Sequence, residues 1–208
     1  MFRVSLTSRL QGRLSDLKLH EATSSFINDE ATSSFINDFG FANVSSDLKV
    51  TFTGQSEQKY KEYGYARGHK LCRERPYFEL KILKDRDDGV GIGLCGEKWG
   101  AGEMPGWPRY PSLGYHSDDG CLFFSNSSHG QGLNFGAKCN LGDRMGCGII
   151  FSDGGEAETA FFTRNGKLVG WAPMFDPELL YPVTVSALPA IIELNFSANI
   201  PALPPACK

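Results

Sequence analysis

Apolar and polar residues alternate along most of the chain after about residue 47. Two stretches, Asp47–Thr53 and Tyr77–Leu83, alternate strictly, as a half-buried β-strand does. In Gly89–Leu94 the alternating small residue is glycine, which predicts a strand with another sheet or side chain pressed closely against one face. Further strand-like runs are Gly120–Phe124, Met145–Phe151, Thr159–Thr163, Lys167–Trp171, Tyr181–Ala187 and Ile191–Phe196.

The connections between these runs indicate how the strands pair. Arg164-Asn165-Gly166-Lys167 is the strongest hairpin signal, because Asn-Gly tolerates the positive φ angles of a type I′ turn. Convincing helical periodicity is absent, and short strands follow one another without intervening helices. The pattern therefore predicts an all-β chain that folds as an antiparallel two-sheet β-sandwich.

The first forty residues differ from this pattern. The nonapeptide Glu21–Asp29 is repeated letter for letter as Glu30–Asp38. A single repeat is not a solenoid, which needs at least three units, so a duplication or an assembly error is the plainer interpretation and a short linear motif the sharper one. We expect residues 1–40 to form a mostly irregular, mobile arm, residues 41–200 the folded domain, and residues 201–208 a tail.

Charge and composition narrow the classes of function. The net charge is −3, from 21 basic and 24 acidic residues, which argues against binding nucleic acid. No run of 18 apolar residues occurs, so we expect no membrane span. The N-terminus lacks the apolar centre of a secretory signal. The six cysteines form no C-x-x-C pair, which argues against zinc, and several lie in apolar runs. Free thiols fit a reducing compartment, so we expect the cytoplasm, with the nucleus also compatible.

The sequence offers little that could carry out catalysis. His116, Asp118 and Asp119 lie together, but adjacent strand residues point in opposite directions, and Asp119-Gly120 favours a turn between two strands. No G-x-S-x-G elbow and no phosphate loop with Lys-Ser/Thr are present. We therefore expect no enzyme activity, no cofactor, no metal and no small-molecule substrate.

One long connection has the composition of a binding surface. The segment from Cys95 to Leu113 carries Trp99, Met104 and Tyr110 among glycines and prolines. Long ordered loops that are rich in aromatic residues are more often binding surfaces than spacers.

Six motifs in fixed order resemble the SPRY domain family over roughly Asp47 to Phe196. They are similar above all to the branch that contains Ran-binding protein M and SPRY domain-containing protein 3. The motifs are Pro105–Trp107, Gly114–Gly120, Phe135-Gly136, Gly142–Gly148, Phe161–Lys167 and Leu180–Pro182.

The resemblance implies a bent β-sandwich that binds a protein partner, as a peptide segment or a folded domain, and a role as an adaptor is one function of this kind. Family members usually carry an effector module such as a RING or SOCS-box region, and none is recognisable here. Three loops are implied as the binding face: Gly64–His69, Trp99–Tyr110 and Leu188–Ala190. The partner-binding residues that we expect from them are Tyr65, Arg67, His69, Trp99, Met104, Tyr110, Leu188 and Pro189. Trp107 lies within a shared motif, so we expect it to pack in the core or the loop.

A carbohydrate-binding or glycosidase-like protein is the alternative, because related lectin-type sandwiches have such functions. A glycosidase needs two carboxylates roughly 5–10 Å apart on one face. Glu79 and Glu193 are the main acidic residues at strand positions. If these two residues faced each other across a groove, the alternative would gain support; otherwise they are exposed-face residues.

Overall fold

The fold is known from a computed structural model, which describes residues 42–53, 63–85, 89–100, 103–126, 132–187 and 189–204. The predicted N-terminal arm, with its duplicated nonapeptide, and residues 205–208 lie outside the described residues. In the described part of the chain every regular element is a β-strand. No helix long and apolar enough to cross a membrane is found there.

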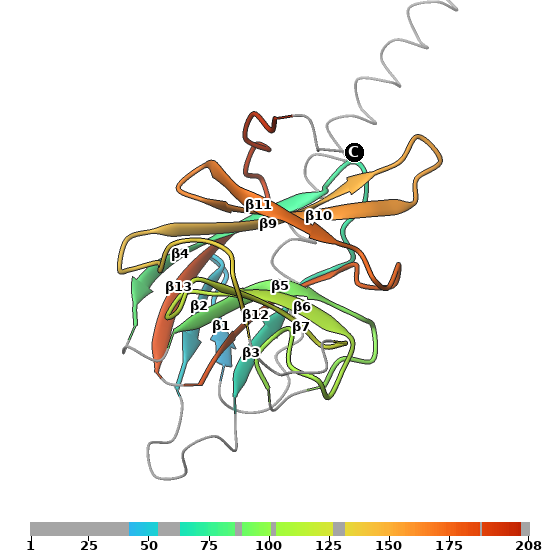
Figure 1. Ribbon diagram of the computed structural model, residues 1–208. Helices are drawn as coiled ribbons and strands as arrows, with labels where there is room; N and C mark the ends of the chain where they lie inside the picture. Colours follow the sequence, from blue (N-terminus) through green and yellow to red (C-terminus); the bar gives the residue numbers. More distant parts are fainter. Residues whose placement is uncertain are drawn as a thin grey trace, which may run out of the picture. The chain divides into compact units, whose positions relative to one another are not determined.

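Two antiparallel sheets lie face to face (Figure 1), which confirms the predicted fold class. The order of the seven-stranded sheet is β1 (Ala42–Val44), β2 (Lys49–Phe52), β13 (Ala190–Asn195), β4 (Tyr77–Lys84), β9 (Arg144–Phe151), β10 (Ala157–Arg164) and β11 (Lys167–Pro173). The order of the six-stranded sheet is β3 (Gly64–Arg67), β12 (Tyr181–Ser186), β5 (Val90–Cys95), β6 (Ser112–His116), β7 (Cys121–Phe124) and β8 (Leu133–Asn134).

The main hydrophobic core fills the space between the sheets. Alternate residues of each strand point into it, because successive side chains of a strand lie on opposite faces. Phe78, Leu80 and Ile82 of β4 have at most 1% of their surface exposed, and Ile92 and Leu94 of β5 have none. The apolar alternation in the sequence therefore identified the inward face of both sheets.

Every run predicted as a strand coincides with one, but some strands are additional to the prediction. The short edge strands β1 and β8 are two of them. Gly64–Arg67, predicted as a loop, forms β3, which pairs with β12, and Ser112–His116 forms β6 between β5 and β7. In β3 and β6 nearly every residue is buried, so the apolar-to-polar alternation that reveals a half-buried strand is absent.

The predicted hairpin between β10 and β11 has the expected backbone. Asn165 has a φ of 52° and Gly166 a φ of 73°, as a type I′ turn requires. Asp143 fastens this hairpin to the start of β9: its carboxylate accepts hydrogen bonds from Asn165 Nδ2 at 2.7 Å and from Arg164 NH2 at 2.8 Å. These bonds lower the pKa of Asp143 to about 2.

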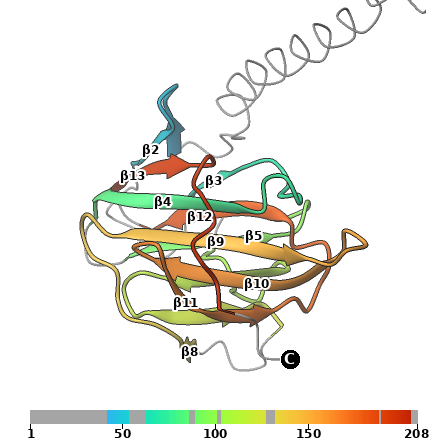
Figure 2. The same ribbon diagram turned by 90° about the horizontal axis from the view of Figure 1, so that it is seen from above.

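The outer face of the seven-stranded sheet is crossed by the last described residues. Figure 2 shows this C-terminal segment running across β4, β9 and β10, on the side away from the other sheet. On the same face, Tyr77 and Phe161 stack at a centroid distance of 5.6 Å and are 2% and 0% exposed. Gly146 and Gly148 leave the room that these rings occupy.

Candidate functional site

A second apolar cluster lies outside the main core, on the outer face of the six-stranded sheet. It joins outward residues of β3, β5 and β12 to side chains from the Gly96–Pro111 connection. Its buried members are Tyr63, Tyr65, Cys95, Trp99, Met104, Val183 and Val185. Around them lie Trp107, Tyr110, Tyr181 and Ala187, which are half-buried. We call this set of residues the outer aromatic cluster.

Glycines in the sheet allow the connection to lie flat on it. A Cβ atom on Gly91 would lie 2.8 Å from Pro105 Cδ and 2.9 Å from Met104 Cε. A Cβ on Gly114 would lie 2.3 Å from the Pro105 carbonyl oxygen. The sequence predicted a close approach at the glycine-rich strand, and the approaching group is this connection.

His116 of β6 fixes the centre of the connection at Pro105. Its Nε2 atom lies 2.9 Å from the Pro105 carbonyl oxygen, and its ring stacks on Phe123 at a centroid distance of 4.2 Å. Burial lowers the pKa of His116 to about 4, so the ring is neutral at pH 7 and Nε2 donates its hydrogen to the carbonyl. Nearby, the Gly106 N–H donates to Ser112 Oγ at 2.9 Å.

Glu103 fixes the later part of the connection, at Arg109 and Tyr110. Its Oε1 atom accepts the backbone N–H of Tyr110 at 3.0 Å, and the backbone of Arg109 also hydrogen-bonds to this carboxylate. Burial raises the pKa of Glu103 above its ordinary value, and the two backbone hydrogen bonds oppose that rise. Hydrogen bonds from the same segment thus fix the turn that carries Trp107 and Tyr110.

Aromatic side chains of the connection meet those of the strand β3 region edge to face. Tyr65 and Trp99 have ring centroids 5.0 Å apart, and Tyr63 and Trp107 have theirs 5.6 Å apart. Such T-shaped pairs add stability beyond the area that they bury. In the described part of the chain the buried Trp99 Nε1 has no hydrogen-bond partner.

The predicted partner-binding residues fall into three groups. Tyr65, Trp99 and Met104 are at most 5% exposed, so they form the base of the outer aromatic cluster. Arg67, Tyr110 and Pro189 are half-buried, and His69 is exposed. Leu188 lies outside the described residues. A contact role for these residues stays a prediction.

Two residues at the rim of the cluster were not selected from the sequence. Trp107 is half-buried and Arg109 is exposed, next to Tyr110 in the same turn. The shared motif favoured a packing role for Trp107, in the core or the loop. Its edge-to-face contact with Tyr63 depends on how the connection folds back onto the sheet, which the order of residues does not show.

Two basic side chains lie over aromatic rings of the cluster. Arg67 lies over the Tyr181 ring, 5.3 Å from its centroid, and donates from NH1 to the Glu97 carbonyl oxygen. Arg109 lies over the Tyr110 ring at 5.5 Å. Lys98 is exposed in the same connection. Cations over aromatic faces are held in place without losing their charge.

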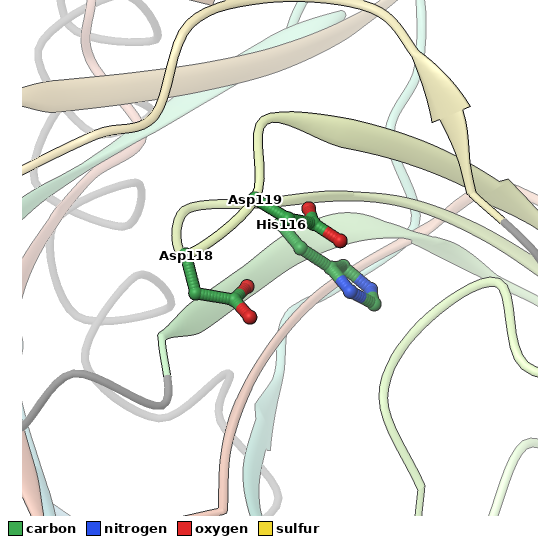
Figure 3. Close-up of side chains that lie close together, drawn as sticks. All are labelled: His116, Asp118 and Asp119. Carbon is green, nitrogen blue, oxygen red and sulfur yellow. The ribbon is translucent and has the colours of Figure 1, made fainter.

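His116, Asp118 and Asp119 come together at the turn between β6 and β7 (Figure 3), with their ligand atoms within 4.8 Å of one another. His116 is already bonded to Pro105, and Asp119 Oδ1 accepts the N–H of Cys121 at 2.8 Å. Burial and the Asp119 charge raise the pKa of Asp118. The predicted turn is confirmed, and two of the three side chains have structural roles in it.

Glu79 and Glu193 line one hollow of about 350 Å³ on the outer face of the seven-stranded sheet. Lys81, Arg144 and Asn195 line it as well. Glu79 is 7% exposed and accepts the Tyr77 hydroxyl at 2.8 Å. The hollow therefore holds both carboxylates together with two cations.

The sequence is similar to known proteins over most of the described part. The SPRY domain family matches residues 75–199. Human SPRY domain-containing protein 3 is 35% identical over 140 residues, which cover 65% of this chain and 31% of that protein. Ran-binding protein 9 of Xenopus tropicalis is 38% identical over 125 residues, covering 59% and 21%. The chain thus spans less than a third of the length of these relatives.

Solved structures resemble the fold. The crystal structure of a human SPRY domain superposes with a TM-score of 0.64 at 31% identity, covering 77% of this chain and 98% of that one. The SPRY domain of human HERC1 has a TM-score of 0.57 at 16% identity, which supports the fold alone. The resemblance that the sequence motifs indicated is confirmed.

Proposed function

This chain belongs to the SPRY domain family, and on that premise we propose that it binds a protein partner through the outer aromatic cluster and its rim. The partner is a peptide segment or a folded domain, and the chain acts as a non-catalytic module, as members of SPRY families generally do. Some of its relatives are named Ran-binding protein 9 and Ran-binding protein 10, which is consistent with protein partners. A role as an adaptor is part of the proposal.

The observation that supports the proposal is an apolar cluster that is separate from the main core between the sheets. The sheets already bury their inward faces against each other, yet the Gly96–Pro111 connection holds further aromatic side chains on the outside. Trp107, Arg109 and Tyr110 lie at its surface, and Trp, Tyr and Arg are the residues that most often supply binding energy in interfaces.

Rigidity of the connection supports the same function. Glu103, His116 and Ser112 fix its backbone through hydrogen bonds, so little conformational entropy remains to be lost when a partner binds. A rigid framework with a few aromatic side chains at its surface is typical of a surface that binds without rearranging.

The test is capture of partners by the full chain and by a rim variant. Trp107→Ala with Tyr110→Ala removes two half-buried rings and leaves Trp99 and Tyr65 in place. We expect this variant to retain its fold, as near-ultraviolet circular dichroism and thermal unfolding would report, and to lose the proteins that the unchanged chain captures from lysate.

Lys81→Ala with Arg144→Ala is the matched control, because both side chains are exposed on the other sheet. Capture should survive this change. Equal capture by the rim variant, or loss of capture in the control alone, would contradict the proposal.

The carbohydrate alternative keeps one supporting observation, the hollow that Glu79 and Glu193 share. Against it, Glu79 is engaged by Tyr77, and the two cations in the hollow suit a cross-strand charge pattern on a sheet surface. Release of nitrophenol from nitrophenyl glycosides by the full chain, abolished by Glu79→Gln, would favour the alternative. We expect no release.

A further inference from the structure

We infer that the segment bound at the outer aromatic cluster is acidic: a peptide whose carboxylates meet the basic rim while an apolar residue rests on the aromatic side chains. The inference rests on the proposed function and adds the chemical class of the partner. It follows from the charges of the rim and from the kind of hydrogen-bonding group that the rim offers.

The rim of the cluster carries three cations. Arg67 of β3 lies over the Tyr181 ring and Arg109 lies over the Tyr110 ring, and Lys98 is exposed next to Trp99 in the chain. Among the described residues the ion pairs are Lys49–Asp47, Arg73–Asp153 and Arg164–Asp143, so none of the three rim cations is neutralised by one. The chain as a whole has a net charge of −3, so this basic rim is local.

The carboxylates of the same segments form no ion pair with these cations among the described residues. Glu103 is 7% exposed and turns its oxygens toward backbone N–H groups of Arg109 and Tyr110. Glu97 is exposed, and its backbone carbonyl, not its carboxylate, receives Arg67. Asp176 lines a hollow with Pro108 and Pro111, so the positive charge is local to Arg67 and Arg109, whose guanidinium groups lie over aromatic rings of the cluster.

The hydrogen-bonding groups point to the same partner. Guanidinium and ammonium groups only donate hydrogen bonds. A carboxylate or carbonyl oxygen of a bound segment would satisfy these rim donors, whereas a basic segment would add more donors.

The cations that lie over aromatic rings also favour a planar carboxylate as the group that they bind. Arg67 and Arg109 lie over the rings of Tyr181 and Tyr110, which limits the directions in which their N–H groups point. A pre-organised guanidinium loses less entropy when it pairs with a planar carboxylate than a flexible one does. Asp or Glu beside an aliphatic or aromatic residue is the pattern that we expect.

The test selects phage-displayed random short peptides on the immobilised full chain, followed by fluorescence polarisation with the enriched sequences. We expect enrichment of Asp and Glu next to an apolar residue, and affinity that falls with added salt. Lys98→Glu with Arg109→Glu should weaken binding of the enriched peptides by about tenfold or more.

The control reverses two cations on the other sheet, as Lys81→Glu with Arg144→Glu, which alters the net charge of the chain by the same amount. It should change the affinity by less than about twofold, because exposed charges beyond a Debye length are screened. Thermal unfolding of both double variants checks that each is folded.

The outcomes separate this inference from the proposed function. The inference would be overturned, and the proposed function left intact, by the following result. The enriched peptides are neutral or basic, they bind Trp107→Ala more weakly than the unchanged chain, and their affinity is the same for the Lys98→Glu, Arg109→Glu variant. Failure to enrich any peptide would overturn the inference and leave a folded-domain partner to the capture test of the proposed function, and peptide binding that is lost only in the control would overturn both. Displacement of the selected peptides by an equal concentration of an oligo(dT) strand would overturn the inference, since it would mark a general polyanion surface.

Discussion

The outer faces of the two sheets are covered in opposite ways. On the six-stranded sheet β5 and β6 present glycines on which Met104 and Pro105 of a long connection lie, and the same connection adds Trp99, Trp107 and Tyr110 to the cluster. On the seven-stranded sheet the strands supply the aromatic side chains, Tyr77 and Phe161, and the C-terminal segment crosses β4, β9 and β10 on the same face (Figure 2). The same face also carries a row of charged side chains on neighbouring strands.

The difference distinguishes a structural face from a face that can bind a partner. The charged row consists of Lys49, Glu193, Lys81 and Arg144, and exposed charges of this kind make small contributions to stability. The other face keeps large side chains at a rim that is fixed by buried hydrogen bonds. We therefore assign binding to the connection side and expect changes on the two faces to have unequal effects.

The largest effect should come from adding a methyl group at a glycine on which the connection rests. Gly114→Ala would place a methyl group against the Pro105 carbonyl oxygen, at 2.3 Å if nothing moved. Because the obstacle is backbone, the connection must lift, and we expect a loss of about 3 kcal/mol in the free energy of unfolding together with loss of partner binding.

Gly155→Ala is the matched change on the seven-stranded side. Gly155 has a φ of 86°, and a methyl group added there would meet no described atom within 4 Å, so only backbone strain of about 1 kcal/mol is expected. Urea titration of both variants measures the comparison. Equal losses would show that the connection does not rest on Gly114.

Acid should weaken the connection side through His116. Its pKa is lowered from 6.5 to about 4 in the folded chain, so the stability it contributes is complete above pH 6.5 and is lost as the pH falls toward 4. The loss approaches about 3 kcal/mol at the lower limit. His116→Gln keeps a donor for the Pro105 carbonyl and does not titrate.

Urea titrations at pH 7 and pH 5 measure this effect. The difference in the free energy of unfolding between the two pH values should be smaller in His116→Gln than in the unchanged chain. If both proteins lose the same stability, the neutral His116 is not what makes this side sensitive to acid.

A smaller effect is expected at the hairpin of the seven-stranded sheet. Asp143→Asn weakens the bonds to Arg164 and Asn165 and should cost about 1–2 kcal/mol. Because the pKa of Asp143 is lowered from 3.8 to about 2, its contribution is present above pH 3.8 and is lost as the pH falls toward 2. Partner binding should be unchanged.

Asp153→Asn is the control for that change. Asp153 pairs with Arg73 at 3.9 Å with its side chain fully exposed, and such a pair should contribute little. Thermal unfolding should therefore separate the two variants, and a larger loss in Asp153→Asn would contradict the assignment of the Asp143 bonds as the fastening of the hairpin.

The smallest effect is expected from Lys81→Ala with Arg144→Ala. These cations lie directly opposite each other on β4 and β9, so removing them should change the free energy of unfolding by no more than about 0.5 kcal/mol in a urea titration. Like charges in register repel, so a slight gain is compatible with this expectation. A loss above roughly 1 kcal/mol would show that the charged row is structural.

Much of the fold could be predicted from the sequence, because alternation and Asn-Gly turns are local signals. The run at Tyr77–Lys84 and the Asn165-Gly166 turn are examples. Strand β3 was missed because Tyr65 packs outward while Ala66 packs inward, so both faces are buried and no alternation remains.

The site was predicted less completely than the fold. The composition of the long connection indicated a binding surface, but Trp99 and Met104 lie at its base and Trp107 and Arg109 lie at its rim. Which aromatic side chain faces solvent depends on how the connection folds back over the glycines of β5 and β6. That contact is set by the tertiary arrangement, and local patterns carry no information about it.

The most direct test of the account is hydrogen–deuterium exchange of the full chain, free and bound to a captured partner. We predict that binding slows exchange in the Gly96–Pro111 connection and in β3, with β4, β9 and β13 unchanged. Slower exchange in β4, β9 and β13, with none in the connection, would contradict the assignment of binding to the outer face of the six-stranded sheet.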